Sequence, residues 1–190
     1  MTKARPAGVT PLSLHIRDIR KDITALKTAL EFADAKVAVV IATDGLPTDY
    51  GGTCNDHTKL EFVKALRSLE ELPVWVVIRL CTNESDVVKF YNDIDSELEL
   101  SLEVLSNFVG EAKEIHQRNK WINYALPLHR CREFGMQQRA FDFLDERKLT
   151  IDEMREFCAF LFGNKAIELL PDVHVDWKGF MAGLSDVMEK

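Results

Sequence analysis

The chain has 190 residues, of which 46% are hydrophobic and 29% are charged, and its formal net charge is -7. This length and composition suffice for one sizeable hydrophobic core and exclude a disordered chain. The acidic balance, with charges of both signs intermixed, argues against nucleic acid and against a membrane surface as partners.

Hydrophobic periodicity predicts a long helix near the start of the chain. Apolar residues recur at intervals of three and four from Leu12 to Leu30, which places them on one helical face. Thr10 supplies an N-cap and Pro11 a first-turn proline. The helix is therefore expected to run from Pro11 to about Phe32.

Two apolar segments predict buried strands. Val37 to Ala42 and Val74 to Leu80 are rich in β-branched residues and lack polar alternation, as expected for parallel strands that are covered on both faces. A helical pattern at residues 60–69 separates them. This order of elements predicts a parallel sheet with crossover connections.

The remainder of the chain is expected to be mostly helical, with a weak third strand candidate at Ile122 to Leu126. Thr150, followed three residues later by Glu153, has the pattern of a capping box at a helix start. The predicted fold is α/β, a Rossmann-like parallel sheet with a mostly helical C-terminal extension. Its expected division is an α/β region at residues 1–85 and a helical region at residues 86–190 packed on it.

Two carboxylates follow the first predicted strand. Asp44 and Asp49 lie in the segment Thr43-Asp-Gly-Leu-Pro-Thr-Asp49, at the carboxyl end of a strand, where open α/β sheets bind ligands. Oxygen ligands of this kind suit Mg²⁺ or Ca²⁺. Taken alone, however, Asp44, Gly45 and Asp49 are more simply interpreted as turn formers.

The segment Gly8-Val-Thr-Pro-Leu12 before a helix, together with a strand that ends in Thr43-Asp-Gly45, resembles the von Willebrand factor A family. The resemblance covers about residues 8–80. It implies that Thr10 and Asp44 are ligands of a divalent ion at a metal-ion-dependent adhesion site. It further implies that Gly45, Thr48 and Asp49 form a rim that faces a protein partner.

The family's D-x-S-x-S motif, which ends its first strand, does not occur in the chain. Thr10 and Asp44 alone would bind Mg²⁺ or Ca²⁺ weakly, because affinity follows the number of assembled oxygen ligands. We expect a truncated domain rather than a decayed site. Without that strand, residues 37–42 would expose an open edge, and self-association through this edge is expected.

The sequence therefore predicts an intracellular protein–protein interaction module and not an enzyme. The alternative is a metal-dependent hydrolase or phosphotransferase that uses Asp44 and Asp49, although no phosphate-binding loop or nucleophile motif accompanies them. A purely structural fragment is the third hypothesis. The four widely spaced cysteines and the lack of an apolar N-terminal run favour a cytoplasmic location.

Overall fold

A parallel sheet forms the centre of the first half of the chain. The computed structural model describes residues 9, 11–136 and 138–189. In it β1 (Val37–Thr43) and β2 (Val74–Leu80) pair in parallel from Val37 opposite Val74 to Thr43 opposite Leu80. Both predicted strands and their parallel pairing are confirmed, so the fold is α/β.

The third strand is not where the sequence placed it. β3 (Leu102–Leu105) pairs in parallel with β2, which gives the order β1-β2-β3. The expected strand at residues 122–126 is wrong, because residues 122–125 are irregular and Leu126 begins a helix. β3 instead lies in a part of the chain for which only helical structure was expected, within a region predicted to be mostly helical.

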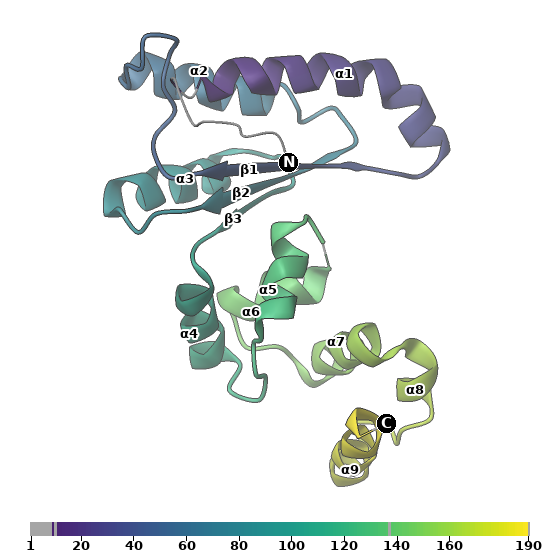
Figure 1. Cartoon of the computed structure of the whole chain (residues 1–190). Helices are drawn as coiled ribbons and strands as arrows, with labels where there is room; N and C mark the ends of the chain where they lie inside the picture. The colour runs from purple at the N-terminus through teal and green to yellow at the C-terminus, as the bar shows by residue number, and fades with distance from the viewer. Residues whose placement is uncertain (1–8, 10, 137, 190) are drawn as a thin grey trace, which may run out of the picture. The chain divides into compact units, whose positions relative to one another are not determined.

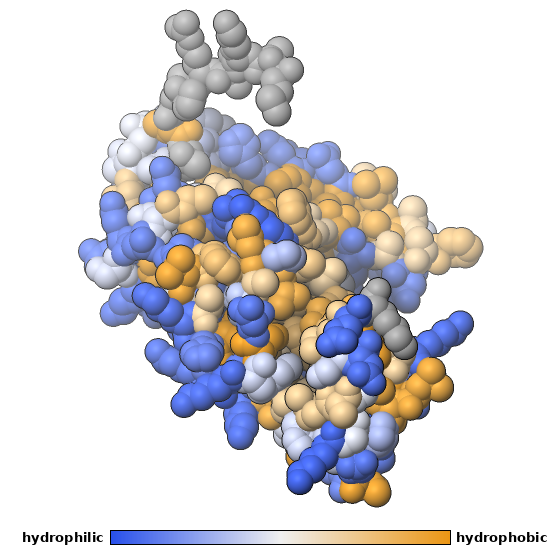
Figure 2. Space-filling model, turned by 60° about the horizontal axis from the view of Figure 1, so that its bottom comes forward, coloured by the Kyte–Doolittle hydropathy of each residue, from blue (hydrophilic) through white to orange (hydrophobic). Residues whose placement is uncertain are grey.

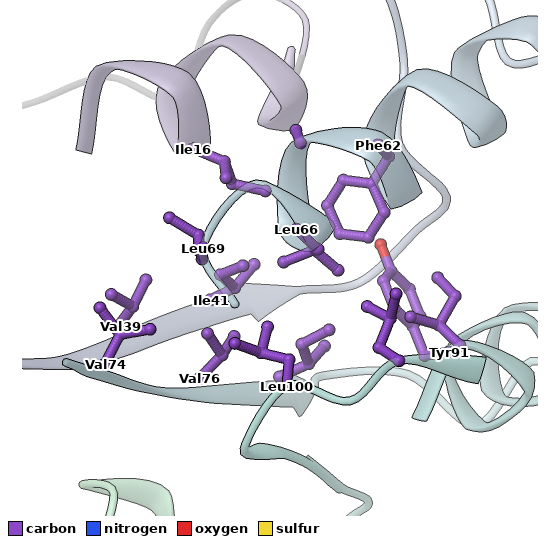
Figure 3. Close-up of a cluster of buried hydrophobic side chains, with 14 of the residues drawn as sticks. Ile16, Val39, Ile41, Phe62, Leu66, Leu69, Val74, Val76, Tyr91 and Leu100 are labelled. Atoms are coloured by element: carbon purple, nitrogen blue, oxygen red, sulfur yellow. The ribbon is translucent and has the colours of Figure 1, made fainter. Parts of the chain in front are cut away.

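Three helices cover one face of this sheet. They are α1 (Leu12–Phe32), α2 (Asp56–Arg67) and α3 (Ser85–Glu97). Ile16, Phe62 and Tyr91, one from each helix, are buried against β1 and β2 in a single apolar cluster (Figure 3). The long predicted helix is confirmed, although it begins at Leu12 and Pro11 occupies its N-cap position.

The opposite face of the sheet is only partly covered. Residues 129–135, which include most of α5 (Leu126–Glu133), lie against this face. Arg79 on β2 pairs with Glu133, and Glu103 on β3 pairs with Arg132, with N to O distances of 2.7 Å and 2.6 Å. Gly135 then approaches Ala38 closely, so that a Cβ at Gly135 would lie 2.8 Å from the Cβ of Ala38.

β1 is not buried on both faces as the sequence suggested. Its burial alternates, because Val39, Ile41 and Thr43 are buried whereas Ala38, Val40 and Ala42 are exposed. The apolar character of the strand led to the wrong expectation, since small and β-branched residues face solvent here. One face of β1 is therefore available at the surface.

Two compact units divide the described residues differently from the expected boundary at residue 85. The first unit extends to Phe108 and includes His129–Gly135, and the second comprises Val109–Leu128 and the residues from Met136 onward. The sheet explains the difference, because α3 and β3 belong to it. The order of elements along the chain can be followed in Figure 1.

The second unit is helical. Its helices are α4 (Phe108–Arg118, of which Phe108 is counted with the first unit), α6 (Arg139–Glu146), α7 (Ile151–Phe162), α8 (Asn164–Glu168) and α9 (Trp177–Met188). The capping box predicted at Thr150 and Glu153 is confirmed at the start of α7. In the described part of the chain, no helix has both the length and the apolar composition needed to cross a membrane.

Candidate functional site

The loop after β1 is held in place by a buried tyrosine. The carbonyl oxygen of Gly45 accepts hydrogen bonds from Thr43 Oγ1 at 3.0 Å and from the hydroxyl of Tyr91 at 3.1 Å. Tyr91 is fully buried and packs edge-on against Phe62, with ring centroids 5.8 Å apart. The backbone on which Asp44 stands is thus anchored to the core through α3.

Burial raises the pKa of Tyr91 to about 12, and we expect this to be visible in the stability of the first unit at high pH. Because the folded state favours the neutral phenol, the stabilisation is complete below pH 10 and is lost as the pH rises from 10 to 12. The loss should approach about 3 kcal/mol, at about 1.4 kcal/mol per unit of pKa. Tyrosinate absorbance should show a delayed ionisation that Tyr91→Phe removes. An identical titration of the wild type and Tyr91→Phe above pH 10 would contradict this expectation.

Asp49 builds the loop. Its Oδ1 accepts hydrogen bonds from the backbone N–H groups of Gly51 and Thr53, both at 2.8 Å. The N–H of Gly52, a residue with a φ of +79°, donates to the carbonyl oxygen of Asp49 at 3.1 Å. These contacts favour the turn-forming interpretation of Asp49, because they are the bonds by which aspartate closes a turn.

Asp44 lies at the carboxyl end of β1, as predicted, and its side chain is exposed. Within the described residues its carboxylate makes no hydrogen bond or ion pair. Thr10 lies outside the described residues, so its pairing with Asp44 at a metal site stays a prediction. The described residues contain no group of three or more histidine, cysteine, aspartate or glutamate side chains placed to hold a metal ion.

A shallow pocket adjoins the loop. It has a volume of about 190 Å³ and is lined by Thr48 and Asp49 together with Ser13 and Arg17 of α1 and His57 of α2. Neither Asp44 nor Gly45 is among the described residues that line it. The structure thus brings Thr48 and Asp49, two of the three expected rim residues, together beside the first turn of α1, whereas the third, Gly45, does not line this pocket.

The open edge of β1 is the feature next to Asp44 that is best defined. The N–H of Val37 donates to Pro73 and the N–H of Cys81 donates to Thr43, at 2.9 Å and 2.7 Å. Because backbone groups alternate along a strand, the N–H and C=O groups of Ala38, Val40 and Ala42 point away from β2. In the part of the chain that is described, no strand pairs with this edge.

Comparisons of the chain with protein-family models, with curated proteins and with solved structures find no significant match.

Proposed function

We propose that the chain is a protein-interaction module of the von Willebrand factor A type, whose partner adds an extended strand beside β1. The observation that carries the proposal is the open edge formed by Ala38, Val40 and Ala42, where outward backbone groups coincide with exposed side chains. Unpaired strand edges of this kind are templates for pairing with another chain.

The side chains on this edge suit such a partner. Val40 is 44% exposed although it lies in the middle of the strand. β1 contains no charged residue that would hinder pairing with another strand. Strand addition would satisfy the outward backbone groups, and contact with Val40 would bury apolar surface. A second copy of the chain can supply such a strand, so self-association is part of the same proposal.

Asp44 would then face the end of the added strand. Of the two carboxylates in this loop, that of Asp49 accepts hydrogen bonds from backbone N–H groups. The carboxylate of Asp44 makes no hydrogen bond or ion pair with the described residues. A single carboxylate does not by itself fit Mg²⁺ or Ca²⁺, which require several oxygen ligands. The proposal therefore rests on the edge of β1, and a divalent ion would need Thr10 and oxygen ligands from the partner.

Proline at position 40 tests the proposed edge. The N–H of Val40 points away from β2, so Val40→Pro removes an outward donor without breaking the β1–β2 ladder. We expect this substitution to weaken partner capture about tenfold, because the loss of one hydrogen bond, at the upper end of its usual net contribution, changes an affinity by that factor. Val40→Thr, which keeps the N–H and the β-branched shape, should capture the partner normally.

The partner strand can be located by placing a photo-crosslinking side chain at Ala42, with the same group at the exposed Leu26 of α1 as control. A discrete product from position 42 but not from position 26, abolished by Val40→Pro, is expected from cell extract or from the purified chain. Equal capture by Val40→Pro and Val40→Thr would refute the edge. Asp44→Asn, assayed with and without Mg²⁺, shows separately whether an ion takes part.

We also propose that the module works in the cytoplasm. All four cysteines are free, and Cys54 and Cys81 are exposed. Exposed thiols persist in a reducing compartment and are oxidised elsewhere, which supports this location.

A further inference from the structure

A pocket in the second unit combines cationic and aromatic side chains. It has a volume of about 490 Å³ and lies between the end of α4, the segment before α7, and the start of α9. This volume falls within the range of small-molecule sites in proteins, roughly 300–1,000 Å³. The pocket is independent of the edge of β1 and of the function proposed for it.

The charge at this pocket is positive in an acidic chain. Arg118, Lys120 and Lys148 line it, and none of the described residues that line it is an aspartate or glutamate. In the described part of the chain none of the three cations has an ion pair. The neighbouring Arg147 and Glu153 neutralise one another through two bonds of 2.7 Å and 2.9 Å, so they leave the positive charge of the other three uncompensated.

Apart from Gln117, the remaining described wall of the pocket is apolar. Trp121 and Trp177 line it, and these residues are 37% and 39% exposed. Leu149, Ile151 and Met154 complete this wall. Apolar residues interspersed with hydrophilic ones are visible on the surface in Figure 2. Partly exposed tryptophans beside unpaired cations are an arrangement that binds a ligand with an apolar body and an anionic end.

Asn119 gives this pocket a fixed shape. It is fully buried, and its Nδ2 donates to the carbonyl oxygens of Leu144 and Arg147, both at 2.8 Å. Its Oδ1 accepts from the N–H of Leu149 at 2.9 Å and from Nε1 of Trp121 at 3.3 Å. One amide therefore ties the segment that carries Lys120 and Trp121 to the segment that carries Lys148.

We propose that this pocket binds a small amphipathic anion, an alkyl or aryl group of modest size that ends in a carboxylate or phosphate. The apolar group would lie against Trp121 and Trp177, and the anionic end would contact Lys120, Lys148 and Arg118. Charge complementarity selects the anion, since among the described residues the three cations form no ion pair and no acidic side chain lines the pocket.

Tryptophan fluorescence can test the proposal directly. The chain has three tryptophans, so in a Trp75→Phe background the signal comes from Trp121 and Trp177 alone. Decanoate and decyl phosphate, each titrated below its micelle concentration, are the probes, and their comparison identifies the preferred anionic group. We expect a saturable change with at least one of them. Decanol and decyltrimethylammonium should bind about tenfold more weakly or worse, because an exposed ion pair contributes up to about fivefold and several cations act together.

The charge requirement has a matched control. Lys120→Gln with Lys148→Gln should weaken anion binding about tenfold, whereas Lys113→Gln with Lys165→Gln, which changes the same charge away from the pocket, should leave it unchanged. Met154→Asp should abolish binding by placing an anion in the apolar wall, and thermal unfolding verifies that each variant is folded. Equal binding of decanol and both anions, equal effects of the two double variants, or a signal only above the micelle concentration would overturn the proposal.

Discussion

Gly135→Ala is expected to lower the free energy of unfolding of the first unit by about 3 kcal/mol. Gly135 has a φ of +80°, which costs an L side chain about 1 kcal/mol or more. The new Cβ would also lie 2.8 Å from the Cβ of Ala38, and overpacking of this kind costs about 1–3 kcal/mol. The backbone of residue 135 and β1 would have to separate. Chemical denaturation followed by circular dichroism measures the change.

Two further variants isolate the steric part of this effect. Ala38→Gly in the Gly135→Ala background removes the opposing methyl group, so the double variant should be more stable than the sum of the single changes predicts. Gly45→Ala, in the same unit, adds a Cβ that meets nothing within 4 Å, and should change stability by about 0.5 kcal/mol or less. If the stability changes of Ala38→Gly and Gly135→Ala were strictly additive, the contact between the Cβ atoms of residues 38 and 135 would make no contribution to the destabilisation.

The strands differ in how far the sequence reveals them. β1 and β2 were predictable because each has seven residues, of which all but Thr43 in β1 and Arg79 in β2 are apolar and many are β-branched. β3 has four residues, Leu-Glu-Val-Leu, and stands between helices whose periodicity dominates its surroundings. Its pairing with β2 is a long-range interaction that local periodicity does not register.

The exposure of β1 could not be predicted from its composition. Ala38, Val40 and Ala42 are as apolar as their neighbours, yet they are exposed on the face that residues 129–135 cover only in part. Burial on a second face depends on which distant segment covers it. The sequence did predict an open edge at β1, because the chain resembles a family whose sheet has a further strand there. Among the described strands, β1 is indeed at the edge of the sheet.

The sequence predicted where the loop with Asp44 begins, but it did not predict the distant residues that hold this loop in place. The position of Asp44 at a strand end is confirmed, because strand termination by Thr-Asp-Gly is a local signal. The support of Gly45 by Tyr91 joins residues 46 positions apart. Tyr91 could have been suspected only as one aromatic residue on the apolar face of a predicted helix.

Asn119→Ala is expected to destabilise the second unit by about 3–5 kcal/mol. The substitution removes the partner of two carbonyl oxygens, of the N–H of Leu149, and of Nε1 of Trp121. A buried polar group left without a partner costs about 1–3 kcal/mol, and Leu149 is 3% exposed, so water reaches that N–H poorly. Thermal unfolding should show a lower transition temperature.

The neighbouring Asn123 provides the matched control, since it is exposed and Asn123→Ala should change stability by about 0.5 kcal/mol or less. Asn119→Asp distinguishes loss of the donors from loss of side-chain volume. Its carboxylate would face the carbonyl oxygens of Leu144 and Arg147, so this variant should be unstable at neutral pH and recover partly on acidification, when the neutral carboxyl can donate one hydrogen bond. If Asn119→Asp were as stable as the wild type at neutral pH, the amide would not be what joins the two segments of the pocket.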